Sequence, residues 1–453
     1  MTNRRVAMGF LGATALGGAA SLVNRRHGAI AADPHHQTVS QSAAANGLPK
    51  LKITNVKAIL TAPSRARLVV VKVETSEPGL YGLGCATFTQ RAQAVVTAVD
   101  KFLADFARGR DADNIEDMWQ TAYTSSYWRN GPVLNNALSG LDMALWDVKG
   151  KRAGMPVYQL LGGKCRFAVD AYAHAAANDL PALQRSVQGL IDQGFRHVRI
   201  QLGGYGGTSL TSDADFRQAD FGAPNDDYIS QRTYLDSVPQ MFQYIRETCG
   251  DEVELLHDIH ERVSQRDAIR MIQQLEPYRP FFIEDPFPPE PNRGYFRQLR
   301  AATTVPIAMG ELFNNPHEWS DLISERLIDY IRVHISQIGG LTPARKLAAF
   351  AEHFGVRTAW HGPGDVSPVG HAANAHLDLA ISNFGIQERS HFNQATQDVF
   401  PGAPTCENGY IHVNEAPGFG VDIDETLAAK FPAPEAPDNW LPIRRADGSA
   451  VRP

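Results

Sequence analysis

Three carboxylates recur at a regular spacing in the second half of the chain. Asp258, Glu284 and Glu311 are separated by 26 and 27 residues, and each stands near the end of a short apolar run. Carboxylates that meet in one place repel one another unless a cation lies among them, and hard oxygen donors suit Mg²⁺. A single carboxylate is more often a helix cap or a surface ion pair. Three at this spacing instead predict a magnesium site.

A histidine follows the first of these carboxylates. His260 lies two residues after Asp258, and side chains at positions i and i+2 of a strand share a face. We therefore expect both to point into one cavity, where a histidine beside a metal ligand becomes a candidate for proton transfer. Asp285 follows Glu284 on the opposite face or in the next turn, and we expect it to support the site rather than to bind the metal.

The elements that position these groups are short strands that alternate with helices. After Pro156 the apolar runs are AVDAYAHA, HVRIQL, VELLHDIH, FFIEDP, PIAMGEL, YIRVHIS, RTAWHGP and FGIQER. Eight such alternations predict an α/β protein with a (β/α)7–8 TIM-like barrel, whose active site forms at the carboxyl ends of the strands. Further polar groups at these ends are candidates for substrate binding or proton transfer: His174, Arg199, Gln201, His361, Asp365 and Glu388. His334, also at a strand end, is expected to support the site.

The other segments predict a domain order. Residues 51–165 combine β-rich runs with an amphipathic helix at 137–151 and predict an α+β capping domain. Residues 166–400 form the barrel, and 401–453 form a C-terminal segment that packs back on the cap. Residues 203–230 are long, Gly-rich and polar, which suggests a lid or active-site loop.

The front of the chain predicts export. Residues 1–32 hold four arginines and no acid, and the apolar run Met8–Val23 is too short for a confident membrane span. Arg4-Arg5 is typical of a twin-arginine signal, which predicts a periplasmic or exported protein with residues 33–50 as a linker. Without the leader, the net charge falls from −6 to −10, so nothing favours nucleic acid as a partner, and membrane association has no support beyond the leader.

Several motifs resemble a known family. HDIHER (257–262), FFIEDP (281–286) and AMGELF (308–313) resemble the metal-site segments of the enolase superfamily. DxHER, RxHxSxIGG, WHGPGD and PGFGVDIDE are similar to the mannonate dehydratase subgroup, which includes starvation-sensing-type proteins and gluconate dehydratases. The similarity runs from Leu51 to the C-terminus.

The resemblance implies a hydro-lyase that acts on an acid sugar with Mg²⁺. Such enzymes remove the proton next to a carboxylate and expel the 3-hydroxyl group, giving a 2-keto-3-deoxy acid. It implies that Asp258, Glu284 and Glu311 bind the metal, that His260 is the acid and that Arg199 belongs to a basic dyad. It also implies a homo-oligomer, commonly a tetramer or octamer, and places four residues in the substrate pocket: His174, His361, Asp365 and Glu388.

The chain departs from the subgroup at the tyrosine of that dyad. The subgroup has it about a dozen positions after the arginine, near Thr211 here. Tyr205 is the nearest tyrosine and our candidate substitute, with Tyr228 a weaker one, and Thr89 replaces an expected asparagine of the cap. Two alternatives therefore stay open. One is a racemase, epimerase or cycloisomerase that uses His260 and His361 from opposite faces, and the other is an exported sugar-acid or metal binder without activity.

Overall fold

The computed structural model describes residues 49–64, 66–210, 226–288, 294–434 and 442–452. The predicted leader, nearly all of the linker and Thr211 lie outside these ranges. The chain divides into two units, residues 1–49 and 50–453, and the second holds every element named below. Among the described helices, none combines the length and the apolar character that a membrane crossing requires.

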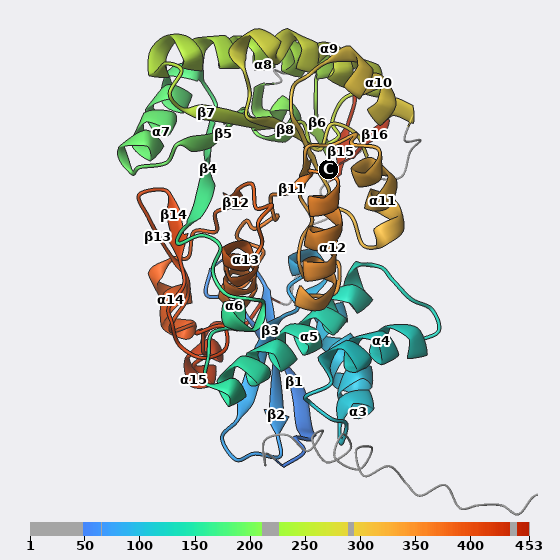
Figure 1. Cartoon of the computed structure of the whole chain (residues 1–453). Coiled ribbons are helices and arrows are strands. Elements are labelled where there is room, and N and C mark those ends of the chain that lie inside the picture. The colour runs from blue at the N-terminus through green and yellow to red at the C-terminus, as the bar shows by residue number, and fades with distance from the viewer. Residues whose placement is uncertain (1–48, 65, 211–225, 289–293, 435–441, 453) are drawn as a thin grey trace, which may run out of the picture. The chain divides into compact units, whose positions relative to one another are not determined.

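The capping domain is an antiparallel sheet packed against a long helix. The sheet has the order β1 (Ile53–Thr61), β2 (Leu68–Thr75), β3 (Tyr81–Cys85), and α5 (Pro132–Ala153) lies across it (Figure 1). Two glycines of β3 permit this contact, since a Cβ on Gly82 or Gly84 would stand 2.0 Å from a carbonyl oxygen of α5. The other helices of this domain are η1 (Thr89–Arg91), α2 (Ala92–Ala98), η2 (Val99–Leu103), α3 (Ala104–Ala107), α4 (Ile115–Ser125) and α6 (Val157–Leu160).

The barrel holds eight parallel strands within the described part of the chain, which confirms the predicted fold class. In chain order they are β4 (Val169–Ala177), β5 (His197–Leu202), β7 (Glu254–Asp258), β8 (Phe282–Glu284), β9 (Ile307–Met309), β10 (Tyr330–Ile331), β11 (Arg357–Thr358) and β12 (Gln387–Glu388). β12 pairs with β4, and a parallel bridge between Thr358 and Phe384 closes the ring on the other side.

Helices connect these strands around the outside of the ring. They are α7 (Leu180–Asp192), α8 (Gln231–Cys249), α9 (Gln265–Leu275) with η4 (Glu276–Tyr278), α10 (Gly294–Ala302), α11 (Pro316–Ser324), α12 (Leu341–His353) and α13 (Pro368–Ala380). Serine or asparagine side chains cap the first turns of several of them, as Ser264 does for α9 and Asn315 for α11.

One apolar layer fills the barrel interior directly below the polar groups of interest. Its members come from seven different strands or their immediate ends: Tyr172, Leu256, Phe282, Ala308, Tyr330, Ala359 and Ile386. Because side chains alternate along a strand, the residue two positions later points into the next layer, at the mouth of the barrel. That rule carries the chain from Leu256 to Asp258, from Phe282 to Glu284 and from Ile386 to Glu388.

The C-terminal segment divides between three neighbours. α14 (Gln394–Val399) follows the barrel, and α15 (Glu425–Ala428) reaches the cap, where Glu425 pairs with Lys57 at 2.6 Å and Lys72 at 2.7 Å. The hairpin of β13 (Thr405–Glu407) and β14 (Tyr410–His412) instead pairs with β4 of the barrel.

The last described residues lie elsewhere still, so the expectation that the whole segment packs on the cap is wrong for them. β15 (Ile443–Arg444) and β16 (Ala450–Val451) form a small sheet with β6 (Asp227–Tyr228). β15 pairs with β6 in parallel, and Arg444 adds an ion pair to Asp226 at 2.6 Å. Tyr228 is therefore a member of this sheet.

Candidate active site

Strand register brings the predicted site residues together at one end of the barrel. His174 on β4 is the register partner of Arg199 on β5, and Asp258 at the end of β7 is the partner of Glu284 at the end of β8. Glu311 lies two residues beyond β9. His334 and His361 follow β10 and β11 and form a parallel bridge with each other, and Glu388 ends β12.

The carboxylates lie close together, but they are not equivalent. Donor atoms of Asp258, His260 and Glu311 lie within 4.8 Å of one another, and among the described residues this is one of two such groups of possible metal ligands. Glu284 joins this group through a shared arginine, and its Oε1 atom is buried with no hydrogen-bond partner in the described structure. Burial raises the pKa of Asp258 to about 6, and the nearby Glu284 and Glu311 carboxylates add to that effect. Oxygen donors of this kind, one of them unused, fit a divalent cation.

Arg199 is the centre of the hydrogen-bond network on one side. Its Nη1 atom donates to Glu284 at 2.8 Å and to Asp258 at 3.2 Å. Its Nη2 atom donates to the Tyr205 hydroxyl at 2.5 Å and lies 3.2 Å from His174 Nδ1. Although burial opposes the charged form, Glu284 holds the pKa of Arg199 well above its ordinary value. The arginine therefore stays cationic and joins the carboxylates to a phenol.

Arg332 is the second buried arginine that connects carboxylates of the site, on the side of Glu311 and Glu388. The sequence pattern did not single it out as a site residue. Its side chain is fully buried and donates to Glu311 at 2.5 Å and to Glu388 at 2.8 Å. A third bond, of 3.3 Å, goes to Asp285. Asp285 in turn accepts from the Gly310 amide at 3.1 Å, so it braces Arg332 and the loop of Glu311. An arginine inside the apolar run YIRVHIS was the available signal.

His260 reaches the site by a different route from the one predicted. β7 ends at Asp258, and His260 lies in a turn with φ of 51°, followed by Glu261 with φ of 58°. The expectation that His260 shares a strand face with Asp258 is therefore wrong. The Asp258 carboxylate accepts the His260 amide at 2.7 Å, which turns the chain away from the strand direction.

The turn nevertheless aims the imidazole at the carboxylates. His260 Nε2 lies 3.2 Å from Glu311 Oε1. Burial disfavours the charged ring, but Asp258 and Glu311 outweigh it and raise the pKa of His260 to about 9. Two consecutive non-glycine residues at positive φ are uncommon, and such strain is concentrated at functional sites. The ring is thus a protonated donor held by the carboxylate cluster.

A glycine-rich turn delivers Tyr205 to Arg199. Gly203, Gly204, Gly206 and Gly207 all have φ between 65° and 75°, a region that other residues rarely adopt. They flank Tyr205 in η3 (Tyr205–Leu210), and Gln201, predicted as a substrate ligand, donates to the Gly204 carbonyl at 3.1 Å and so holds the turn. The Tyr205 ring lies 4.5 Å from the His260 ring. Burial raises the pKa of Tyr205 above its ordinary value, and Asp258, Glu311 and Glu388 raise it further against the opposing effect of Arg199.

The remaining candidates form a second cluster beside Glu311. His334 Nδ1 and His361 Nδ1 are 2.7 Å apart, so one ring donates and the other accepts. Asp365 joins them in the second group of close donor atoms, and its Oδ1 is buried without a hydrogen-bond partner in the described structure. His361 Nε2 lies 3.4 Å from Glu311 Oε2. Burial lowers the pKa of His361, which leaves it neutral and able to accept a proton.

Glu388 is already engaged by the protein. It pairs with Arg332 at 2.8 Å and with His174 at 2.7 Å. The Gly362 amide adds a bond of 3.0 Å.

Thr89 of the cap, which replaces the expected asparagine, also has a structural contact. Its hydroxyl accepts a hydrogen bond from the Arg67 amide at 2.9 Å.

Fold and site together define a capped barrel enzyme with carboxylates and two basic clusters at the strand ends. Residues 48–162 match the model of the mandelate racemase / muconate lactonizing enzyme N-terminal domain, and residues 182–427 match that of the enolase C-terminal domain-like family. The chain belongs to the enolase superfamily, as its motifs predicted, and its relatives are members of the D-galactonate dehydratase family.

Two relatives and one solved structure show how far the likeness extends. A D-galactonate dehydratase family member of Musicola paradisiaca is 51% identical over 419 residues, covering 90% of this chain and 100% of that protein. The family member RspA of Pantoea ananatis is 52% identical over 420 residues, with the same coverage. An enolase from Pantoea ananatis, solved with bound D-gluconate and Mg, superposes with a TM-score of 0.85 at 51% identity over 89% of this chain and all of that one.

Proposed function

We propose that this protein is an Mg²⁺-dependent dehydratase of six-carbon aldonic acids, a hydro-lyase that converts them to 2-keto-3-deoxy acids. One observation carries the proposal most directly: Arg199 connects the carboxylates Asp258 and Glu284 to Tyr205, beside which His260 lies. The relatives' family name and the gluconate and Mg bound in the related structure support the same reaction class.

The residues present fit the metal. Asp258, Glu284 and Glu311 would hold Mg²⁺, and the unused Glu284 Oε1 is the atom most in need of a partner. When bound, the ion stabilises the negative charge that develops on the substrate carboxylate as the neighbouring proton leaves. Besides burial, the Asp258 and Glu311 carboxylates raise the pKa of Tyr205, and a cation held by these two residues would offset their effect.

Tyr205 and Arg199 form the basic pair. The phenol oxygen accepts the α-proton, and the arginine, only 2.5 Å away, stabilises the phenolate before and during that transfer. This arrangement takes the place of the tyrosine that related dehydratases place later in the loop, near Thr211. An acid-sugar site without activity is therefore not the function that the geometry favours.

His260 supplies the acid. Its Nε2 atom lies against the carboxylate cluster, 3.2 Å from Glu311 Oε1, and departure of the 3-hydroxyl group needs a proton at that oxygen, which this imidazole can donate. Because the His260 and Tyr205 rings are 4.5 Å apart, acid and base can serve neighbouring carbons of one substrate. His361, Asp365, His174 and Glu388 would then face the rest of the polyol chain.

A broad aldonate panel tests the reaction class. The protein with Mg²⁺ is incubated with each stereoisomer, and semicarbazide reports any 2-keto acid as an increase in ultraviolet absorbance. Formation of the keto acid from at least one isomer is expected. A panel without any product would contradict the proposal.

A second reaction class rests on the two histidines. His260 and His361 approach different oxygens of Glu311, at 3.2 and 3.4 Å, which is an arrangement that a racemase or epimerase with two bases could use. It predicts exchange of the α-proton, with inversion and without loss of water. The pKa of His361 is lowered and that of His260 is raised, so His361 would act as the base and His260 as the acid in such a reaction.

Export and assembly belong to the same proposal. Arg4-Arg5 and the following apolar run support a twin-arginine leader, and a periplasmic location follows from it. Fractionation of cells, with a variant in which both arginines are replaced by lysine, tests this, and retention of the variant in the cytoplasm is the expected result. We also propose a homo-oligomer, tetrameric or octameric.

A further inference from the structure

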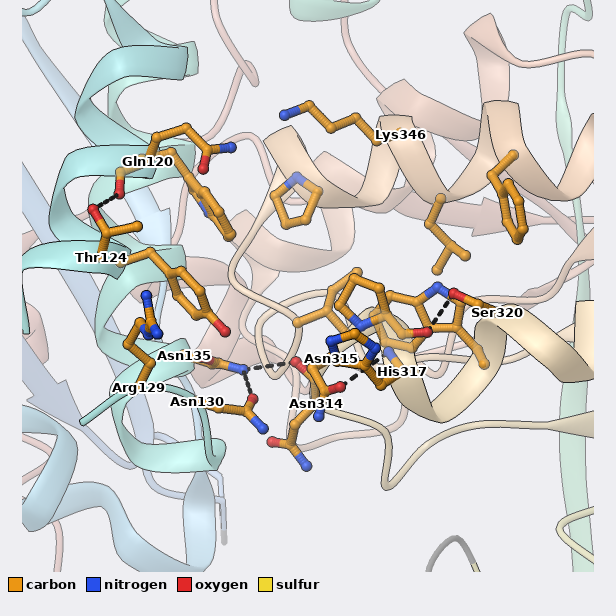
Figure 2. A pocket seen from close by; sticks show the side chains of 18 of the residues that line it. Gln120, Thr124, Arg129, Asn130, Asn135, Asn314, Asn315, His317, Ser320 and Lys346 are labelled. Carbon is orange, nitrogen blue, oxygen red and sulfur yellow. Dashed lines mark hydrogen bonds between the residues drawn. The ribbon is translucent and has the colours of Figure 1, made fainter. Parts of the chain in front are cut away.

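A surface apart from the active site carries an unusual concentration of exposed aromatic side chains. Two hollows adjoin each other there, and Figure 2 shows the larger one, of about 1260 Å³. It lies between α4 of the cap on one side and, on the other, helices α11 and α12 of the barrel with the loop that precedes α11. The smaller hollow, of about 240 Å³, lies on the other side of Tyr123, Asn130 and Asn135, which line both. We call the two together the aromatic face.

Exposure singles out this face. Of the nine large apolar side chains that are exposed in the described structure, five lie on it, and Trp128 and Tyr127, at 81% and 74%, are the most exposed of these five. The others are Phe102, Leu134 and Phe350. Contiguous exposed apolar surface of this kind marks an interaction site in a soluble protein.

Composition indicates that the occupant is a protein. The two hollows are lined by 20 and 13 residues with three in common, so 30 different residues line the face. Eight of the 30 lining residues are aromatic, a share well above the 9% of the whole chain. Arg129 and Lys346 are the only lysine or arginine among them and no lining residue is acidic, and such depletion of charge with enrichment of aromatic residues is typical of an interface core.

The loop between α4 and α5 presents its aromatic pair in a fixed orientation. Tyr127 and Asn130 have φ of 60° and 76°, and the Tyr127 and Trp128 rings meet edge to face with their centres 5.1 Å apart. Below them, Asn135 donates to Asn130, Asn314 and Gln337, so the loop is anchored to the barrel. A preorganised protrusion loses little conformational entropy when it binds.

We propose that the aromatic face is where a second copy of this chain docks, with Tyr127 and Trp128 of each copy entering the larger hollow of the other. An interface with twofold symmetry uses the same patch on both subunits, so the patch must hold both a protrusion and a hollow. This face holds both. Trp, Tyr and Arg also dominate interface energetics, and Arg129 adjoins the protruding pair.

The position of the face connects assembly to the active site. Asn314 and Gln337, whose carbonyls accept from Asn135, each lie three residues beyond a site residue, Glu311 and His334 respectively. Docking of a second copy on this face therefore braces the loops that carry the site.

Sedimentation of the full chain tests the proposal without reference to activity. Trp128→Asp places a charge in the proposed contact, and because Trp128 is 81% exposed, the fold should tolerate it. Phe167→Asp is the matched control, since Phe167 is 87% exposed and lies outside both hollows. Circular dichroism and the midpoint of thermal unfolding confirm that each variant is folded.

The expected result is that wild type and Phe167→Asp share one assembly state, and that Trp128→Asp forms a smaller species with association weakened by at least about 30-fold. Tyr127→Ala should weaken association in the same direction. An assembly unchanged in folded Trp128→Asp would overturn the proposal, as would a wild-type protein that stays monomeric at all concentrations. A wild-type monomer whose aromatic face binds an unrelated protein would overturn it equally.

Discussion

Arg199 donates to the hydroxyl of Tyr205 at 2.5 Å while its other terminal nitrogen donates to Glu284 at 2.8 Å. One guanidinium therefore contacts both Tyr205, the proposed base, and Glu284, one of the carboxylates proposed to hold the metal. The glycines around Tyr205 make this possible, because their positive φ values let the turn fold back onto β5.

The first prediction concerns this pair. Tyr205→Phe removes the oxygen that accepts the α-proton and retains the ring that packs on His260. We expect kcat to fall by about 10²- to 10⁴-fold with little change in KM, because proton transfer rather than binding is lost. Steady-state kinetics with the best aldonate measure it. Tyr228→Phe, in the C-terminal sheet, should keep wild-type kcat, and the reverse pattern would assign the base to Tyr228.

The second prediction separates acid from base. His260→Asn removes the donor for the leaving hydroxyl group but leaves Arg199 and Tyr205 in place. In D₂O the variant should exchange the α-proton of the substrate for deuterium without forming keto acid, as nuclear magnetic resonance would show. If exchange and dehydration vanish together while the protein stays folded, His260 acts before the elimination step and the assignment is wrong.

The third prediction concerns the metal. A ligand that binds only the folded protein raises the free energy of unfolding by about 2.7 kcal/mol at 100 times its dissociation constant. Mg²⁺ should therefore raise the unfolding temperature of wild type, and Glu284→Gln should need at least about tenfold more Mg²⁺ for the same shift. Chelation by EDTA should abolish activity, and added Mg²⁺ should restore it.

Its control is Glu247→Gln, a surface carboxylate on α8 that contacts Gln243. This variant should respond to Mg²⁺ as wild type does. An equal response from Glu284→Gln would remove Glu284 from the proposed ligands.

The fourth prediction concerns a buried carboxyl group of the cap. Asp142 on α5 is 2% exposed, accepts the Thr342 amide at 2.9 Å, and burial raises its pKa to about 7. In the unfolded chain an aspartate titrates near its ordinary value, about 3.9. The contribution of Asp142 to stability is therefore complete below about pH 4 and is lost as the pH rises through about 7, a difference of roughly 4 kcal/mol.

Asp142→Asn keeps an oxygen for the Thr342 amide and cannot ionise. The unfolding temperature of the variant relative to wild type should accordingly be higher at about pH 8 than at about pH 5. A difference between variant and wild type that does not depend on pH would show that Asp142 is ionised in the folded protein, as in the unfolded chain, at both pH values, and the burial argument would fail.

The barrel and its carboxylates could be predicted because they follow from local periodicity. Strand–helix units of about equal length place Asp258, Glu284 and Glu311 on one rim, and alternation along β7 and β8 points Asp258 and Glu284 to the mouth. The superfamily and the fold class, both predicted from sequence, are confirmed. The boundaries of the domains and the roles of individual site residues stay predictions.

The features that could not be predicted depend on where the chain turns and on contacts between distant residues. His260 lies in a turn after its strand, where the Asp258 carboxylate accepts the His260 amide. The spacing of apolar residues in the sequence does not predict such a bond. Arg332 joins Glu311 and Glu388, which are 77 positions apart, and only the closed barrel brings them together. The small sheet of β6, β15 and β16 likewise joins segments more than 200 residues apart in the chain.

The most direct test of the proposed dehydration is a single reaction followed in D₂O. The wild-type protein is incubated with D-gluconate and Mg²⁺, and carbon-bound protons are followed by nuclear magnetic resonance. We predict a 2-keto-3-deoxy acid with one deuterium at carbon 3, because the enol left by elimination takes its new proton from solvent. Deuterium at carbon 2 of unreacted or epimerised substrate, with no loss of water, would contradict dehydration and establish the racemase or epimerase alternative.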